Sequence, residues 1–171
     1  MPHILVVPRH PQRFDEVAAL AERYGLRVSR RSTWPAGPAS NAEAMAADIW
    51  LGDTLGEMAL YYSLADAALL GGSFAALGGQ NLIEAAACGC PVIMGPHTFN
   101  FAEAAQNAEA AGAARRVTDM ACGVRVAMEL VSDASSAKAQ AVASCLAFAA
   151  RNRGATVKTL DAIRSFGALL Q

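Results

Sequence analysis

The sequence predicts an α/β domain in which a mainly parallel, six-stranded, Rossmann-like sheet carries helices on both faces. Short aliphatic runs alternate with segments of helical periodicity along the 171 residues, and strands joined by helical crossovers form parallel pairs. The composition is 54% hydrophobic and 17% charged, which is typical of a globular chain with its own core. We therefore expect residues 1–171 to form one domain.

The expected elements follow from periodicity and from the glycine, proline and capping residues between the periodic segments. Strands are expected at residues 3–8, 26–31, 47–51, 66–70, 91–94 and 113–117. Helices are expected at residues 11–24, 54–62, 81–87, 100–111, 120–131, 142–149 and 156–170, the last of them packed at the edge of the sheet. The inward face of the second of these helices is expected to comprise Leu55, Met58, Ala59 and Tyr62. The fifth helix is indicated by Met120, Val124, Ala127 and Val131, and the sixth by Val142, Leu146 and Ala149.

The composition excludes several classes of function. A formal net charge of −1 offers no basic field to a phosphate backbone, which excludes general nucleic-acid binding. Cys88 and Cys90 are spaced C-x-C with no histidine nearby, a poor match to zinc ligands, so no metal site is expected. No apolar run reaches the roughly 20 residues of a membrane helix, and nothing resembles a signal peptide. We expect a soluble chain in the reducing cytoplasm.

Residues 71–84 are the most informative segment and read Gly-Gly-Ser-Phe-Ala-Ala-Leu-Gly-Gly-Gln-Asn-Leu-Ile-Glu. Two glycine pairs let the backbone approach a ligand closely, and amides at the start of the following helix favour an anion such as phosphate. The pattern is neither G-x-G-x-x-G nor a P-loop. Asn81 and Glu84 also have the spacing of a helix cap, so Glu84 is open to two interpretations: a capping partner, or an acceptor for ribose hydroxyls.

Other loops follow the C-terminal ends of the expected strands, where parallel sheets bind ligands. Arg9 and His10 follow the first strand, and Arg9 is interpreted either as a ligand for phosphate or carboxylate or as a solvated side chain. For His97, packing within its loop is favoured over a ligand contact. Helix capping is a sufficient explanation for the polar side chains of residues 53–57, and no Ser-His-Asp or Cys-His arrangement indicates a nucleophile.

Five motifs occur in order along the chain. They are Val7-Pro8-Arg9-His10-Pro11-x-Arg13-Phe14, Gly52-Asp53-Thr54-x-Gly56-Glu57-Met58, Gly71-Gly72-Ser73-Phe74, Gly78-Gly79-Gln80-Asn81-Leu82-x-Glu84 and Gly95-Pro96-His97-Thr98-Phe99-Asn100-Phe101. Together they resemble the C-terminal half of the 3-deoxy-D-manno-octulosonic acid (Kdo) transferases, glycosyltransferases of the GT-B fold that build the inner core of lipopolysaccharide. The resemblance covers nearly the whole chain, and the last motif is the most distinctive.

The resemblance implies transfer of Kdo from CMP-Kdo to a lipid A precursor at the cytoplasmic face of the inner membrane. It also implies inversion at the anomeric carbon, no essential metal and no other cofactor. This chain is then expected to hold the donor, with Glu84 as the ribose ligand. The donor contacts that the resemblance implies are Arg9, His10, Gly72, Ser73, Gly78, Gly79, Gln80, Asn81 and Glu84, with His97 and Asn100 as further candidates.

In this family the acceptor-binding half carries the membrane-docking surface and the catalytic glutamate, and we expect that half to lie outside this chain. No catalytic residue is therefore expected here, membrane contact is expected only through the full-length enzyme, and the isolated chain is expected to be inactive. The family often has histidine where this chain has Gln80. A glutamine at this position can still form hydrogen bonds, but it cannot gain or lose a proton as histidine does. The residues alone leave two alternatives open: a uridine-diphosphate-sugar transferase or epimerase domain, and a flavodoxin-like binding module without catalysis.

Overall fold

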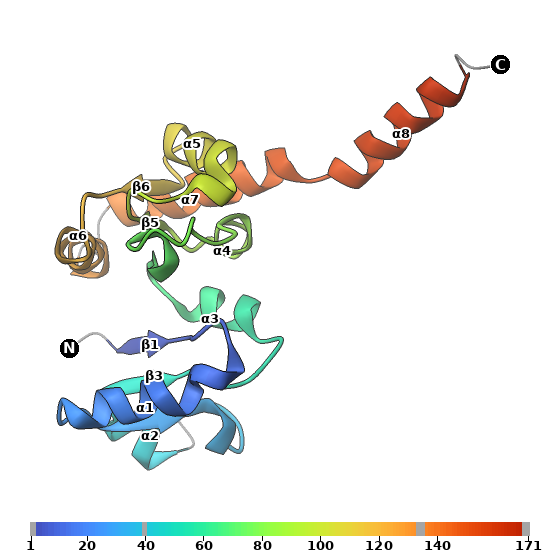
Figure 1. Cartoon of the computed structure of the whole chain (residues 1–171). Helices are drawn as coiled ribbons and strands as arrows, with labels where there is room; N and C mark the ends of the chain where they lie inside the picture. Colours follow the sequence, from blue (N-terminus) through green and yellow to red (C-terminus); the bar gives the residue numbers. More distant parts are fainter. Residues whose placement is uncertain (1–2, 39–40, 133–135, 169–171) are drawn as a thin grey trace. The chain divides into compact units, whose positions relative to one another are not determined.

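The computed structural model describes residues 3–38, 41–132 and 136–168. Contacts divide the chain into two compact units, residues 1–61 and 62–171, and each is described by itself. Each unit contains a three-stranded parallel sheet, and Figure 1 colours the chain from the first strand in blue to the last helix in red.

The first unit comprises, in chain order, β1 (Ile4–Val6), η1 (Pro11–Arg13), α1 (Phe14–Arg23), β2 (Val28–Arg30), η2 (Arg31–Thr33), α2 (Ala42–Ala46), β3 (Ile49–Leu51) and the start of α3 (Met58–Leu64). β3 is the central strand and pairs in parallel with both neighbours. α1 packs against β2 and β3, and α2 packs against β2. α1 is followed by Gly25 at φ 75°, a left-handed conformation that glycine tolerates and that ends the helix where the sequence predicts.

The second unit comprises β4 (Ala68–Leu70), η4 (Gly71–Ser73), α4 (Ile83–Ala87), β5 (Val92–Met94), η5 (Phe99–Phe101), α5 (Ala102–Ala110), β6 (Ala114–Arg116), α6 (Met120–Ser132), α7 (Ser136–Asn152) and α8 (Ala155–Ala168). Its strands lie in the order β4-β5-β6, and both pairs are parallel. The central strand β5 is buried along its whole length, as expected for a parallel strand that is covered on both faces.

Side chains of β5 alternate between two apolar clusters, one on each face of the second sheet. Val92 and Met94 belong to a core that includes Phe148 of α7. Ile93, which lies between them, packs instead with Val126 of α6. Because successive residues of a strand point to opposite faces, this alternation shows that helices cover both faces of the sheet, as predicted.

The six strands occur where the sequence predicts them and all their pairs are parallel, but their grouping differs from the prediction. Among the described residues they form two three-stranded sheets rather than a single six-stranded one. Each strand is only three residues long, so each ladder rests on few hydrogen bonds. Alternating strands and helices specify parallel crossovers, but the alternation does not reveal at which crossover one sheet ends and the next begins.

The buried face of α3 differs from the prediction, and in α6 part of the apolar pattern that indicated the helix is exposed. Leu55 precedes α3 and is 75% exposed, whereas Tyr61 is the buried residue of that helix. In α6, Met120 and Val124 are exposed while Val126 is buried. Apolar residues occur around most of the circumference of α6, so periodicity alone does not select which stripe faces the sheet.

Several described side chains of the last two helices, α7 and α8, are exposed. Leu146 of α7 is 48% exposed, although Ala149 of the same helix is buried. The described side chains of α8, residues 159–165, are exposed, so the predicted packing of this helix is not found for them, and the predicted extension to residue 170 lies outside the described residues. No helix in the part of the chain that the structure describes is long and apolar enough to cross a membrane.

Candidate functional site

The loops that follow β4 and β5 are held together by Ser73. Its side chain is fully buried, and its Oγ donates to the carbonyl of Leu70 at 2.6 Å and accepts from the amide of Gly95 at 2.7 Å. The carbonyl of Ser73 accepts from the amide of His97 at 3.0 Å. Because this hydroxyl is buried and engaged on both sides, it links the two loops and forms the frame of the candidate site.

The glycine pair Gly78-Gly79, in the loop that follows β4, lies where this loop closely approaches the loop that follows β5. Gly78 and Gly79 have φ values of 85° and 79°, and a Cβ at Gly78 would lie 2.3 Å from Nδ2 of Asn100. Asn100 donates that Nδ2 to the carbonyl of Leu77 and its amide to the carbonyl of Gly78, both at 3.1 Å. The amide of Gly79 donates to the carbonyl of Gly72 at 3.1 Å, so it is not free to bind a phosphate in this conformation.

Arg116, the last residue of β6, reaches the loop after β5. Its Nη1 donates to the carbonyl of Gly95 at 3.2 Å and to Oγ1 of Thr98 at 3.0 Å, and its Nε pairs with Oε2 of Glu109 at 3.2 Å. Sequence reasoning missed this residue. The available signal was its place at the C-terminal end of a parallel strand, where it pairs in register with Met94 at the end of β5.

The loop that follows β4, residues 71–84, is called the glycine loop. Further polar side chains of the candidate site lie at the end of this loop. Oδ1 of Asn81 accepts from the amide of Ile83 at 3.0 Å, and its Nδ2 donates to Oε1 of Glu84 at 3.3 Å. Glu84 is exposed, and Gln80 and His97 are half-buried. Leu82 rather than the predicted Asn81 is the N-cap of α4, and it makes no side-chain capping hydrogen bond. The contact with Asn81 engages one carboxylate oxygen of Glu84 at the start of this helix, which leaves both a local role and a ribose role open for Glu84. α4 has only five residues, so its dipole attracts a phosphate less than a full-length helix would.

In the first unit, Arg9 and His10 follow β1 and are exposed. Within the described ranges, the guanidinium of Arg9 has no hydrogen-bond or ion-pair partner, in contrast to Arg30 and Arg31, which pair with Asp15 and with a glutamate of the same unit. An arginine without an internal partner keeps all its donors for a ligand or for solvent. The structure thus brings together the predicted residues of the second unit, while Arg9 and His10 are described only within the first.

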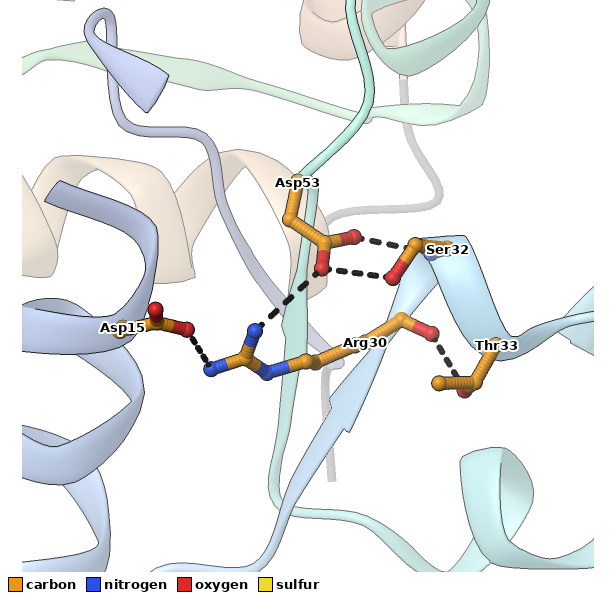
Figure 2. A network of polar contacts seen from close by, with 5 residues as sticks. All are labelled: Asp15, Arg30, Ser32, Thr33 and Asp53. Atoms are coloured by element: carbon orange, nitrogen blue, oxygen red, sulfur yellow. Dashed lines mark hydrogen bonds and ion pairs between the residues drawn. The ribbon is translucent and has the colours of Figure 1, made fainter. Parts of the chain in front are cut away.

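A polar network ties the loop after β3 to the loop after β2 (Figure 2). Ser32 donates its amide and hydroxyl to the Asp53 carboxylate at 2.8 and 2.7 Å, and Nη1 of Arg30 lies 3.8 Å from the same carboxylate. Nη2 of Arg30 pairs with Asp15 at 2.6 Å, and the hydroxyl of Thr33 donates to the carbonyl of Arg30 at 2.8 Å. The Asp53 side chain is 5% exposed. Its predicted role in helix capping is therefore replaced by a tie between two loops.

Glu57 is a second anchored carboxylate of the first unit. Its carboxylate accepts hydrogen bonds from three side chains: that of Thr54, that of Tyr61 at 3.0 Å and that of Arg31 at 2.8 Å. The hydrogen bond from Thr54, followed by those of Tyr61 and the charge of Arg31, lowers the pKa of Glu57 from its ordinary value. The capping spacing of Thr54 and Glu57 thus produces a contact between their side chains.

The edge of the second sheet offers the side-chain amide of Gln80, the imidazole of His97 and the exposed carboxylate of Glu84, which suit hydrogen bonds to a hydroxylated ligand. Among the described residues, no group of three or more His, Cys, Asp or Glu side chains could hold a metal ion.

Comparisons with known proteins identify relatives over nearly the whole chain, although no family model matches it. The chain is 50% identical over 165 residues to 3-deoxy-D-manno-octulosonic acid transferase of Bordetella pertussis, a match that covers 96% of this chain and 37% of that protein. It is 33% identical over 163 residues to the protein of the same name from Haemophilus influenzae, covering 95% of this chain and 37% of that one. The chain thus spans 37% of the length of these curated relatives.

A solved structure with the same fold is the C-terminal CMP-Kdo binding domain of WaaA from Acinetobacter baumannii. The TM-score is 0.74 at 29% sequence identity, and the match covers 84% of this chain and 72% of that domain. The sequence relatives are thus named Kdo transferases, and the solved structure of similar fold is named a CMP-Kdo binding domain.

Proposed function

Because this chain belongs to the Kdo transferase family and has the fold of a C-terminal domain of that family, we propose that it is the donor-binding half of an inverting glycosyltransferase. The donor is CMP-Kdo, and the acceptor is a lipid A precursor that the rest of the enzyme holds at the cytoplasmic face of the inner membrane. The observation that carries the proposal is the match to a CMP-Kdo binding domain, with a TM-score of 0.74 over 84% of this chain.

The proposed donor contacts divide between the two units. Those of the second unit are Gly72, the backbone of Ser73, Gly78, Gly79, Gln80, Asn81 and Glu84, with His97 and Asn100 as further candidates, and those of the first unit are Arg9 and His10. The amide of Gly79, which donates to the carbonyl of Gly72, is not among the proposed contacting atoms. Glu84 accepts hydrogen bonds from the vicinal ribose hydroxyls, and Asn81, whose Nδ2 lies 3.3 Å from Oε1 of Glu84, orients that carboxylate. Arg9 offers its unpaired guanidinium to the phosphate or to the Kdo carboxylate.

We further propose that the general base of the reaction lies outside these 171 residues, so that the chain binds the nucleotide but does not transfer the sugar. General-base catalysis needs a group held within hydrogen-bond reach of the attacking hydroxyl. Incubation of the chain with CMP-Kdo and a lipid A precursor should therefore yield no glycosylated product. Product above the level of a protein-free control would contradict this part of the proposal.

Calorimetric titrations with CMP, UMP and NAD in parallel test the binding function itself. We expect weak binding of CMP, because half of a two-domain cleft leaves much of the ligand in water, and weaker or undetectable binding of the other two. Preference for UMP would indicate a uridine-nucleotide enzyme instead. Binding of none of the three would contradict a donor-binding domain.

The ribose role of Glu84 is tested by Glu84→Gln, with Glu129→Gln, an exposed glutamate of α6, as the matched control. A charge-assisted hydrogen bond contributes roughly 1.5–3 kcal/mol, or about ten- to hundredfold in affinity. We expect Glu84→Gln to weaken CMP binding by that factor with little change in melting temperature, and to lose discrimination between CMP and its 2′-deoxy analogue. Equal CMP affinity for Glu84→Gln, Glu129→Gln and the parent would leave Glu84 as a helix-capping residue.

A further inference from the structure

The loop that contains the most distinctive motif, residues 95–101, is fastened to the end of β6 by Arg116. Nη1 of Arg116 donates both to the carbonyl of Gly95 at 3.2 Å and to Oγ1 of Thr98 at 3.0 Å. Thr98 is 8% exposed and Arg116 has 28% of its side chain exposed, so both partners lie largely away from solvent. We infer that Arg116 is a positioning residue of the donor site, an inference that rests on the proposed function.

The same loop is fastened from its other side by the glycine loop. Ser73 accepts the amide of Gly95 on its hydroxyl at 2.7 Å and the amide of His97 on its carbonyl at 3.0 Å. Gly95 is thus held from two sides. Its amide donates to Ser73, which follows β4, and its carbonyl accepts from Arg116 at the end of β6. Arg116 therefore acts through Gly95 and Thr98 on the position of His97 and of the glycine loop.

The geometry requires arginine rather than lysine at this position. The planar guanidinium directs Nη1 at two oxygens of the loop while Nε pairs with Glu109 at 3.2 Å. A lysine ammonium is a single point on a flexible stem and cannot hold a loop carbonyl, a hydroxyl and a carboxylate in this arrangement. Glu109 belongs to α5, which contacts β6, so the ion pair orients the guanidinium toward the loop.

The chain offers a matched control in Arg115, which precedes Arg116 in β6 and points to the opposite face because side chains alternate along a strand. The variants are Arg116→Gln, Arg116→Lys and Arg115→Gln in the full chain. The first measurement is amide hydrogen exchange at Gly95 and His97, compared with the amides of β5. The second is the affinity for CMP by calorimetry.

We expect Arg116→Gln to speed exchange at Gly95 and His97 by about tenfold and to weaken CMP binding by a similar factor, the order expected when a charge-assisted hydrogen bond is lost. Exchange within β5 should stay within about twofold, since those amides belong to the sheet. Arg116→Lys should fall between Arg116→Gln and the parent, and Arg115→Gln should match the parent in both measurements.

A cycle with Thr98→Val separates positioning from general loss of stability. If Arg116 acts on the loop through Thr98, the double variant should bind CMP no more weakly than Arg116→Gln alone, whereas independent effects would multiply. Multiplying effects, unchanged exchange at Gly95 and His97, or equal loss in Arg115→Gln would each overturn the inference. If the parent itself does not bind CMP, the proposed function fails, and the exchange measurement still decides whether Arg116 holds the loop.

Discussion

Ser73→Ala should destabilise the second unit by an amount that its buried hydrogen bonds determine. The hydroxyl is fully buried, donates to the carbonyl of Leu70 at 2.6 Å and accepts from the amide of Gly95 at 2.7 Å. Alanine leaves the amide of Gly95 without its partner, while the carbonyl of Leu70, the N-cap of η4, keeps the first backbone bond of that helix. A buried unsatisfied group costs roughly 1–3 kcal/mol. We therefore expect the free energy of unfolding to fall by about 1–3 kcal/mol. A globular domain has about 5–15 kcal/mol in total, so this loss is large.

The assay is urea unfolding followed by circular dichroism, with Ser165→Ala as the matched control. Ser165 is exposed on α8 and its hydroxyl donates to a carbonyl of its own helix at 2.8 Å, so its removal should change the free energy of unfolding by less than about 0.5 kcal/mol. Amide exchange at Gly95 should accelerate in Ser73→Ala alone. A loss below about 0.5 kcal/mol in Ser73→Ala, with Gly95 still protected, would refute the assignment of this hydroxyl as the link between the loops.

Three further predictions concern other parts of the chain. Gly95→Ala would place a methyl carbon 2.5 Å from a backbone oxygen of the glycine loop, so it should lower the melting temperature sharply, whereas Gly71→Ala, with no atom within 4 Å, should not. Hydrogen bonds from the side chain and amide of Arg27 lower the pKa of Asp48 from 3.8 to about 2. The stability difference between the parent and Asp48→Asn should therefore be complete above pH 4 and vanish as pH falls through about 2. Burial raises the pKa of the Cys90 thiol to about 12, so iodoacetamide at pH 8 should alkylate Cys90 only after urea is added, as mass spectrometry would show.

The fold could be predicted where local pattern decides the structure, and less well where tertiary contacts decide it. All six strands and the long helices follow from aliphatic runs and their breakers. α2 was missed although Asn41 caps it, accepting from the amides of Glu43 at 2.9 Å and Ala44 at 3.2 Å. A five-residue helix is too short to show a period. The division of the strands between two sheets depends on contacts distant in sequence, which no local pattern encodes.

The candidate site was predictable as a place more than as a set of contacts. Parallel strands end at one edge, so the loops after β4 and β5 were expected to meet there. Which side chains face a ligand depends on how the loops pack, and this could not be seen in the sequence. Ser73 has a motif position that suggested ligand contact, yet its hydroxyl is buried between Leu70 and Gly95. Arg116 lies outside every motif and still anchors the site loop.

The motif residues of the second unit therefore divide into two groups with different expected phenotypes. The first group is Ser73, Gly78 and Asn100. Ser73 and Asn100 use their side chains for hydrogen bonds between the two loops, and Gly78 allows the loops to approach because it has no side chain. Substitution of any of them should lower stability and CMP affinity together, because the frame must fold before it binds. The second group is Gln80, which is half-buried, and Glu84, which is exposed. Substitution of either should lower the affinity for CMP while the melting temperature stays close to that of the parent. If the Gln80 and Glu84 variants instead lose stability in proportion to affinity, both residues belong to the frame and the donor must be recognised elsewhere on the chain.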